Sequence, residues 1–200
     1  MSSTESSTKS AKHSTRYKHF CDEDSEDNDE NVVASKNTQK TQFEDVIDFM
    51  TQFGQTTYDN PQVSLLKNDE KLKNFRLSLI DEEVSELKEA CKNNDFIEVI
   101  DACGDILYVV FGMCATYGIN INEAFRIIHE SNMSKLCKSE EEARETVEWY
   151  KQNDKRYDSP AYKLCNDTKH WMVYNESTKK VLKSINYTPA NFNTLMKKVD

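Results

Sequence analysis

Two carboxylates, Asp101 and Asp105, lie one helical turn apart in a segment that is otherwise almost entirely apolar. Successive spacings of three, four and three residues place Glu98, Asp101, Asp105 and Tyr108 on a single stripe of a helix. The other positions from 97 to 115 are nearly all apolar or small. This stripe must therefore face something that tolerates negative charge.

A second acidic cluster, Glu82-Glu83-Val84-Ser85-Glu86, lies upstream in another amphipathic segment. There Glu83 and Glu86 lean toward the apolar face, and Glu82 points further outward. Two helices could thus gather several carboxylates, each pair of which repels by roughly 4 kcal/mol at about 4 Å and an effective dielectric near 20. Neither helix face offers Lys or Arg as compensation. The pattern predicts a divalent cation, Mg²⁺ or alternatively Mn²⁺, because the ligands are all oxygen.

The elements that would carry these residues follow from apolar periodicity and from capping residues. Helices are expected over residues 43–53, 69–93, 95–117, 120–132 and 139–152. The third is apolar on nearly all sides, which is typical of a helix at the centre of a bundle. Trp171–Tyr174 and Lys180–Lys183 flank a polar turn and predict a small β-hairpin. The expected fold is all-α, a four-helix bundle with a C-terminal extension that contains the hairpin.

Three segments are expected along the chain. Residues 1–42 are rich in Ser, Thr, Lys and acids, a composition typical of disorder. Residues 43–135 form the helical domain, and residues 136–200 form the C-terminal helix and hairpin extension.

Composition restricts the partners and the compartment. A formal charge of -9 and a pI near 5.1 argue against a general nucleic-acid or anionic-membrane surface. The six cysteines form no CxxC pair, so reduced thiols are expected rather than a disulfide framework. The N-terminus, MSSTESSTKS, is polar and has no apolar signal-peptide core, and no apolar segment reaches the roughly 18 residues of a membrane span. An intracellular, cytoplasmic protein in a reducing environment is expected.

Together, LIDEEVSEL and EVIDACGDILYVV resemble the all-α nucleoside triphosphate pyrophosphohydrolase superfamily, which includes MazG-like enzymes and phosphoribosyl-ATP pyrophosphohydrolases. The similarity runs from about Phe43 to Lys135. The family signature is EExxE followed by ExxD. Alignment on GDILY makes Asp105 the motif Asp and puts Ala102 at the expected Glu, whereas alignment on Glu98-Val-Ile-Asp101 restores ExxD and leaves Asp105 additional.

The resemblance implies Mg²⁺-dependent cleavage between the α and β phosphates of a nucleotide, which yields a monophosphate and pyrophosphate. It also implies roles for particular residues. The metal ligands would be Glu83, Glu86, Asp101 and Asp105; the proton acceptors would be Glu82 and Glu98; and the phosphate- or nucleotide-binding residues would be Arg76, Asn132, Lys135 and Tyr108.

Relatives are commonly homodimers or homotetramers, so a homo-oligomer is expected. Two other function classes stay open from the sequence. Ala102 at a motif position favours a catalytically silent nucleotide- or partner-binding module, and a purely structural helical protein would show no metal-dependent change in thermal stability.

Overall fold

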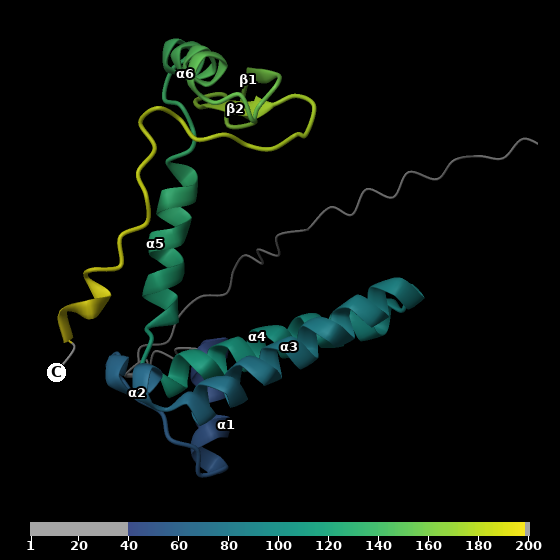
Figure 1. Ribbon diagram of the computed structural model, residues 1–200, viewed down its shortest axis with the longest axis vertical. Coiled ribbons are helices and arrows are strands. Elements are labelled where there is room, and N and C mark those ends of the chain that lie inside the picture. The colour runs from purple at the N-terminus through teal and green to yellow at the C-terminus, as the bar shows by residue number, and fades with distance from the viewer. Residues whose placement is uncertain (1–39, 199–200) are drawn as a thin grey trace, which may run out of the picture. The chain divides into compact units, whose positions relative to one another are not determined.

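Six α-helices and one β-hairpin make up residues 40–198, which the computed structural model describes (Figure 1). The expected disordered tail, residues 1–42, lies outside the described residues except for its last three. The elements are α1 (Gln42–Gln52), α2 (Val63–Asn68), α3 (Glu70–Asn93), α4 (Phe96–Thr116), α5 (Ile121–Met133), α6 (Glu140–Asn153), β1 (Pro160–Leu164), β2 (Trp171–Asn175) and a short 3₁₀ helix, η1 (Leu195–Lys198). The predicted class, all-α with a small C-terminal hairpin, is confirmed.

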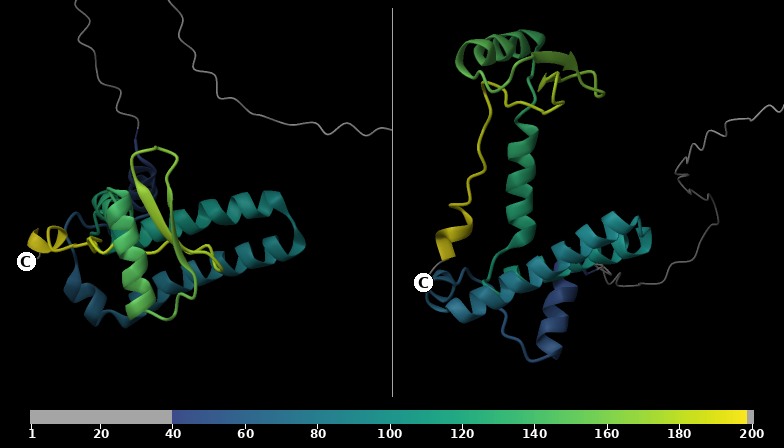
Figure 2. Two further views of the ribbon diagram at one scale, coloured as in Figure 1. Left: turned by 90° about the horizontal axis from the view of Figure 1, so that it is seen from above. Right: turned by 45° about the vertical axis from the view of Figure 1, so that its right-hand side comes forward.

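Polar caps set the ends of the long helices. Thr41 forms a capping box with Glu44 at the start of α1. The side chain of Asp69 accepts from the backbone N–H of Leu72 at the start of α3, and that of Asp95 accepts from two N–H groups at the start of α4. Asn94 adopts the left-handed conformation (φ 55°) that ends α3. Only two residues separate α3 from α4, so the two helices pack side by side as an antiparallel hairpin (Figures 1 and 2).

A small apolar core joins α1 to α4. Val46, Met50 and Ala115 are almost fully buried in it. The segment after α1 is held against the end of α4 by backbone hydrogen bonds from Tyr58 N–H to the Ala115 carbonyl and from Gln62 N–H to the Tyr117 carbonyl. This segment also contains α2, where the sequence predicted only a loop.

The C-terminal extension has a core of its own. Helix α6 packs on both strands of the hairpin. The residues buried there are Cys137, Ala143, Val147, Tyr150, Val173 and Leu182. A two-stranded hairpin gains stability from such packing, because alone it is marginal in water.

The predicted hairpin is only half right. The strand at Trp171–Tyr174 is present as part of β2, but its partner is residues 160–164 rather than Lys180–Lys183. The buried Asn175 side chain contacts both flanking segments: Oδ1 accepts from the Ser159 N–H just before β1, and Nδ2 donates to the hydroxyls of Ser177 and Thr178 in the turn that follows β2. The returning chain pairs with β2 through the bridge between Tyr174 and Val181, with backbone hydrogen bonds from the Asn175 N–H to the Lys180 carbonyl and from the Leu182 N–H to the Val173 carbonyl.

Helix α4 is not buried on all sides, in contrast to the expectation for residues 95–117. Phe96, Ile100 and Leu107 are 75%, 60% and 58% exposed and follow one another at near-helical spacing. These positions face away from α3, and no other element within residues 40–198 covers them. We call Phe96, Ile100, Cys103 and Leu107 the apolar face of α4.

Candidate active site

The α3–α4 hairpin positions the six acidic residues singled out in the sequence. Glu82, Glu83 and Glu86 lie in the middle of α3. Glu98 lies in the first turn of α4, with Asp101 and Asp105 one and two turns further on. Because the helices are antiparallel neighbours, the middle of α3 runs beside the first half of α4. Glu83 is half-buried, and the other five are exposed.

Electrostatics at Glu83 show that acids from both helices approach one another. Partial burial raises the pKa of Glu83, and the negative charges of Glu86, Asp105, Glu82 and Asp101 raise it further. Two of these four neighbours belong to α4. The hairpin therefore concentrates negative charge around the side chain of Glu83.

No cation of the described part of the chain neutralises this charge. None of the ion pairs within residues 40–198 involves any of the six acids. Nor do any three His, Cys, Asp or Glu side chains of these residues already form a group that could hold a metal ion. Together with burial, the neighbouring carboxylates thus raise the pKa of Glu83, but the acids do not form a ready coordination group.

Tyr108 continues the stripe of Glu98, Asp101 and Asp105 toward α1. Its ring packs edge-to-face on Phe49, with centroids 5.5 Å apart. Partial burial raises the pKa of Tyr108, and the nearby charge of Asp45 adds to this. Its contacts therefore lie with α1, at the far end of the stripe from Glu98.

Asn132 lies in the last turn of α5 and Lys135 two residues beyond its end, and the Lys135 ammonium donates to the Asn132 side-chain oxygen at 2.7 Å. Helix α5 makes no substantial packing contact with α3 or α4 in the described residues. Within one chain, Asn132 and Lys135 therefore contact each other rather than the carboxylates.

Arg76 is buried in the seam between α3 and α4, two turns before Glu83. One guanidinium nitrogen, Nη2, donates to Gln55 Oε1 at 3.0 Å. The side chain lines a pocket of about 470 Å³ together with residues of α2, α4 and the segment after α1. Sequence periodicity gave no signal for Gln55, because it lies outside the helices and joins Arg76 only through the tertiary fold.

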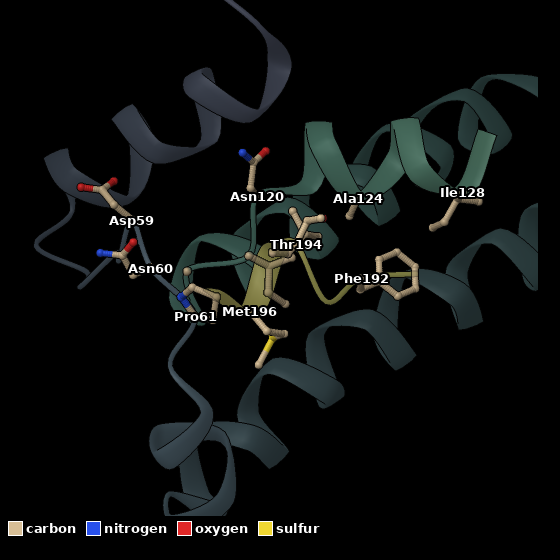
Figure 3. A pocket seen from close by; sticks show the side chains of 12 residues that line it. Asp59, Asn60, Pro61, Asn120, Ala124, Ile128, Phe192, Thr194 and Met196 are labelled. Carbon is tan, nitrogen blue, oxygen red and sulfur yellow. The ribbon is translucent and has the colours of Figure 1, made fainter. Parts of the chain in front are cut away.

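Another pocket, of about 370 Å³, lies where α5 begins (Figure 3). Ile128, Phe192 and Met196 contribute apolar walls, and Asp59 and Asn120 contribute polar groups. None of the predicted site residues lines it. We therefore place the candidate active site at the α3–α4 carboxylates.

Comparisons with known proteins concern the same part of the chain. Residues 46–132 match the sequence model of the phosphoribosyl-ATP pyrophosphohydrolase family. The match extends from α1 to α5 and includes all six acids. The chain is also similar to an uncharacterised protein of Acanthamoeba polyphaga mimivirus, with 27% identity over an alignment of 241 residues that covers 78% of this chain and 96% of the relative.

None of the helices in residues 40–198 combines the length and apolar character that a membrane crossing requires.

The helical part carries the paired acidic clusters on adjacent helices, and the family match covers the same part of the chain. Residues 46–132 are therefore similar to the phosphoribosyl-ATP pyrophosphohydrolases, a family within the all-α nucleoside triphosphate pyrophosphohydrolase superfamily.

Proposed function

We propose that this protein is a Mg²⁺-dependent nucleotide pyrophosphohydrolase. It cleaves between the α and β phosphates of a (deoxy)nucleoside triphosphate or a related nucleotide, and it releases a monophosphate and pyrophosphate. The observation that carries the proposal is the meeting of acids from α3 and α4 around Glu83, within the family domain.

The donor set fits a hard divalent cation. All six side chains offer carboxylate oxygens, the ligands that Mg²⁺ and Mn²⁺ prefer. Burial and repulsion by the neighbouring acids raise the pKa of Glu83, and a cation would relieve the repulsion. Glu83, Glu86, Asp101 and Asp105 would hold it, two from each helix.

Other side chains of the protein would accept the proton and bind the phosphates. When bound, Mg²⁺ neutralises charge on the phosphates and favours the nucleophilic form of a coordinated water. Glu82 and Glu98 flank the proposed ligands in sequence and are exposed, so either carboxylate can accept a proton from the attacking water. Asn132 and Lys135 supply an amide and a cation suited to phosphate oxygens.

We further propose that the working unit is a homo-oligomer, at least a dimer. The apolar face of α4 is exposed in the single chain, and exposed apolar patches of this kind mark interaction sites. A second copy on this face would bury it beside the carboxylate stripe. It also offers a route by which Asn132 and Lys135 of one copy reach the acids of another.

A catalytically silent nucleotide-binding module is the second candidate. Ala102, buried in α4, occupies a position where one alignment of the family motif expects Glu, and the six acids do not form a ready coordination group. Under this alternative, nucleotides bind in the presence of Mg²⁺ without turnover.

Pyrophosphate release from a panel of nucleotides tests the proposal. We expect activity with Mg²⁺, loss with a chelator and recovery when Mg²⁺ is restored. Asp105→Asn should lower activity by at least about a hundredfold, because even the outer partners of metal ligands are worth about 10–100-fold.

Glu89→Gln is the matched control. Glu89 lies on α3 but pairs with Lys92 at the surface, so its loss should leave activity unchanged. Release of orthophosphate alone, or full activity of Asp105→Asn, would contradict the proposal. Mg²⁺-dependent binding without any product would favour the silent module.

A further inference from the structure

The guanidinium of Arg76 is a buried cation without a counter-ion. The residue is only 7% exposed, and no carboxylate of residues 40–198 pairs with it. Its Nε atom has no hydrogen-bond partner among the described residues, and neither has the hydroxyl of the buried Tyr117. An unpaired buried charge is costly, and unsatisfied buried polar groups require an explanation such as a ligand.

Arg76 lies on the same seam as the carboxylates. Seven residues, about two turns, separate Arg76 from Glu83 on α3, and seven separate Gly112 from Asp105 on α4. Gly112 faces Arg76: a Cβ atom at that position would lie 3.3 Å from Nη1. The guanidinium is therefore about 10 Å along the helix axes from the acids, at 1.5 Å per residue.

The pocket beside Arg76 has mostly apolar walls. Tyr58, Leu65, Leu72 and Phe75 line it, two of them aromatic. Its volume of about 470 Å³ lies in the range of small-molecule sites, roughly 300–1,000 Å³. Flat apolar and aromatic walls suit a planar heterocycle better than a free phosphate, which needs several polar contacts.

The main polar group of the pocket, the Arg76 guanidinium, can only donate. Gln55, whose Oε1 accepts from Arg76, can direct its amide N–H groups at a ligand as well. The Thr116 hydroxyl already donates to the Gly112 carbonyl at 2.9 Å, so it offers a ligand an acceptor. The ligand edge that faces Arg76 and Gln55 must therefore present acceptors.

We propose that this pocket binds the nucleobase of the substrate and prefers a base with two adjacent acceptors on one edge. Cytosine (O2 and N3) and guanine (O6 and N7) have such an edge, and Arg commonly binds the guanine pair. Adenine places its N6 donor beside N1 and N7, and uracil places its N3 donor between two carbonyls. The inference rests on the proposed function and adds to it the class of base.

Binding of the four nucleoside monophosphates CMP, GMP, AMP and UMP to the whole protein, with metal chelated, tests this proposal without turnover. We expect CMP or GMP to bind about tenfold or more tightly than AMP and UMP. Arg76→Met should abolish this preference while the unliganded protein melts at an unchanged or higher temperature, since a well-packed apolar replacement of a buried charge is often tolerated.

Arg126→Met is the control, because Arg126 is exposed and paired with Glu123 on α5; the preference should persist. If Arg76→Met does not fold, Gln55→Leu removes the other donor from an exposed position and should weaken the preference.

Equal binding of all four monophosphates, or an unchanged preference in the folded variants, would overturn the proposal. Base-selective binding by a protein that hydrolyses no nucleotide would contradict the proposed function alone. Hydrolysis of all four triphosphates with equal kcat/KM, together with unselective binding, would contradict the pocket alone.

Discussion

At the scale of single residues, burial decides what each charged group can do. Arg76 and Glu83 lie on one face of α3, yet their environments are opposite. The cation lies among apolar walls with an amide as its partner, and the acid lies among four other acids. The pKa of each shifts toward its neutral form for this reason: burial lowers that of Arg76, and burial with like charges raises that of Glu83. Each therefore favours a ligand of opposite character.

Gly118 is the residue whose replacement should damage the helical part most directly. It has φ +64°, and a Cβ atom there would lie 1.8 Å from the Asn60 carbonyl oxygen. We expect Gly118→Ala to lower the free energy of unfolding by at least about 2 kcal/mol, because the left-handed conformation and the clash both oppose it. Denaturant unfolding followed by circular dichroism measures this change.

Gly104→Ala is its control, since Gly104 lies within α4 and has nothing within 4 Å of an added Cβ. That variant should be as stable as the wild type or more stable by up to about 1 kcal/mol, from helix propensity. Equal effects of the two substitutions would show that the contact with Asn60 is not important.

At the scale of elements, α4 has two different faces, for which we propose different functions. Its acidic stripe runs beside α3, and its apolar face is turned away. The C-terminal elements are stabilised by a core of their own. Helix α6 and the hairpin are each too small to be stable alone, and they share this core. The side chain of Ser139 caps α6 by accepting from the backbone N–H of Glu142.

Val173 tests whether that core holds the C-terminal elements together. It is fully buried between β2 and α6. Val173→Ala removes two buried methyl groups and should lower the free energy of unfolding by about 2 kcal/mol. Val181→Ala, at an exposed position of the bridge to β2, should change it by less than about 0.5 kcal/mol. A similar loss in both variants would mean that strand pairing, rather than the core, provides the stability.

At the scale of the whole molecule, the apolar face of α4 predicts self-association. A single chain leaves Phe96, Ile100 and Leu107 in water, at a cost of about 25 cal/mol per Å² of apolar surface. Burial against a second copy would recover this free energy. It would also change the surroundings of the acidic stripe, so activity and assembly should be linked.

Ile100→Glu is the variant that tests self-association. We expect the wild type to scatter light as a dimer or larger assembly at micromolar concentration, and Ile100→Glu to shift it toward the 23.2 kDa monomer, because a charge in an apolar interface is strongly unfavourable. Phe125→Glu makes the same kind of change at a position on α5 that is 68% exposed, and it should preserve the assembly. A monomeric wild type would contradict the prediction.

The sequence by itself determined the long helices, their caps and the two acidic clusters, because periodicity and capping are local properties of the chain. It also supported the family through motifs that lie within single helices. Only the tertiary structure decided the partner of β2, the exposure of one face of α4 and the junction of Arg76 with Gln55. Each of these depends on the arrangement of residues distant in sequence: β1 pairs with β2, no other element of residues 40–198 covers the apolar face of α4, and Gln55 from the segment after α1 accepts from the buried Arg76.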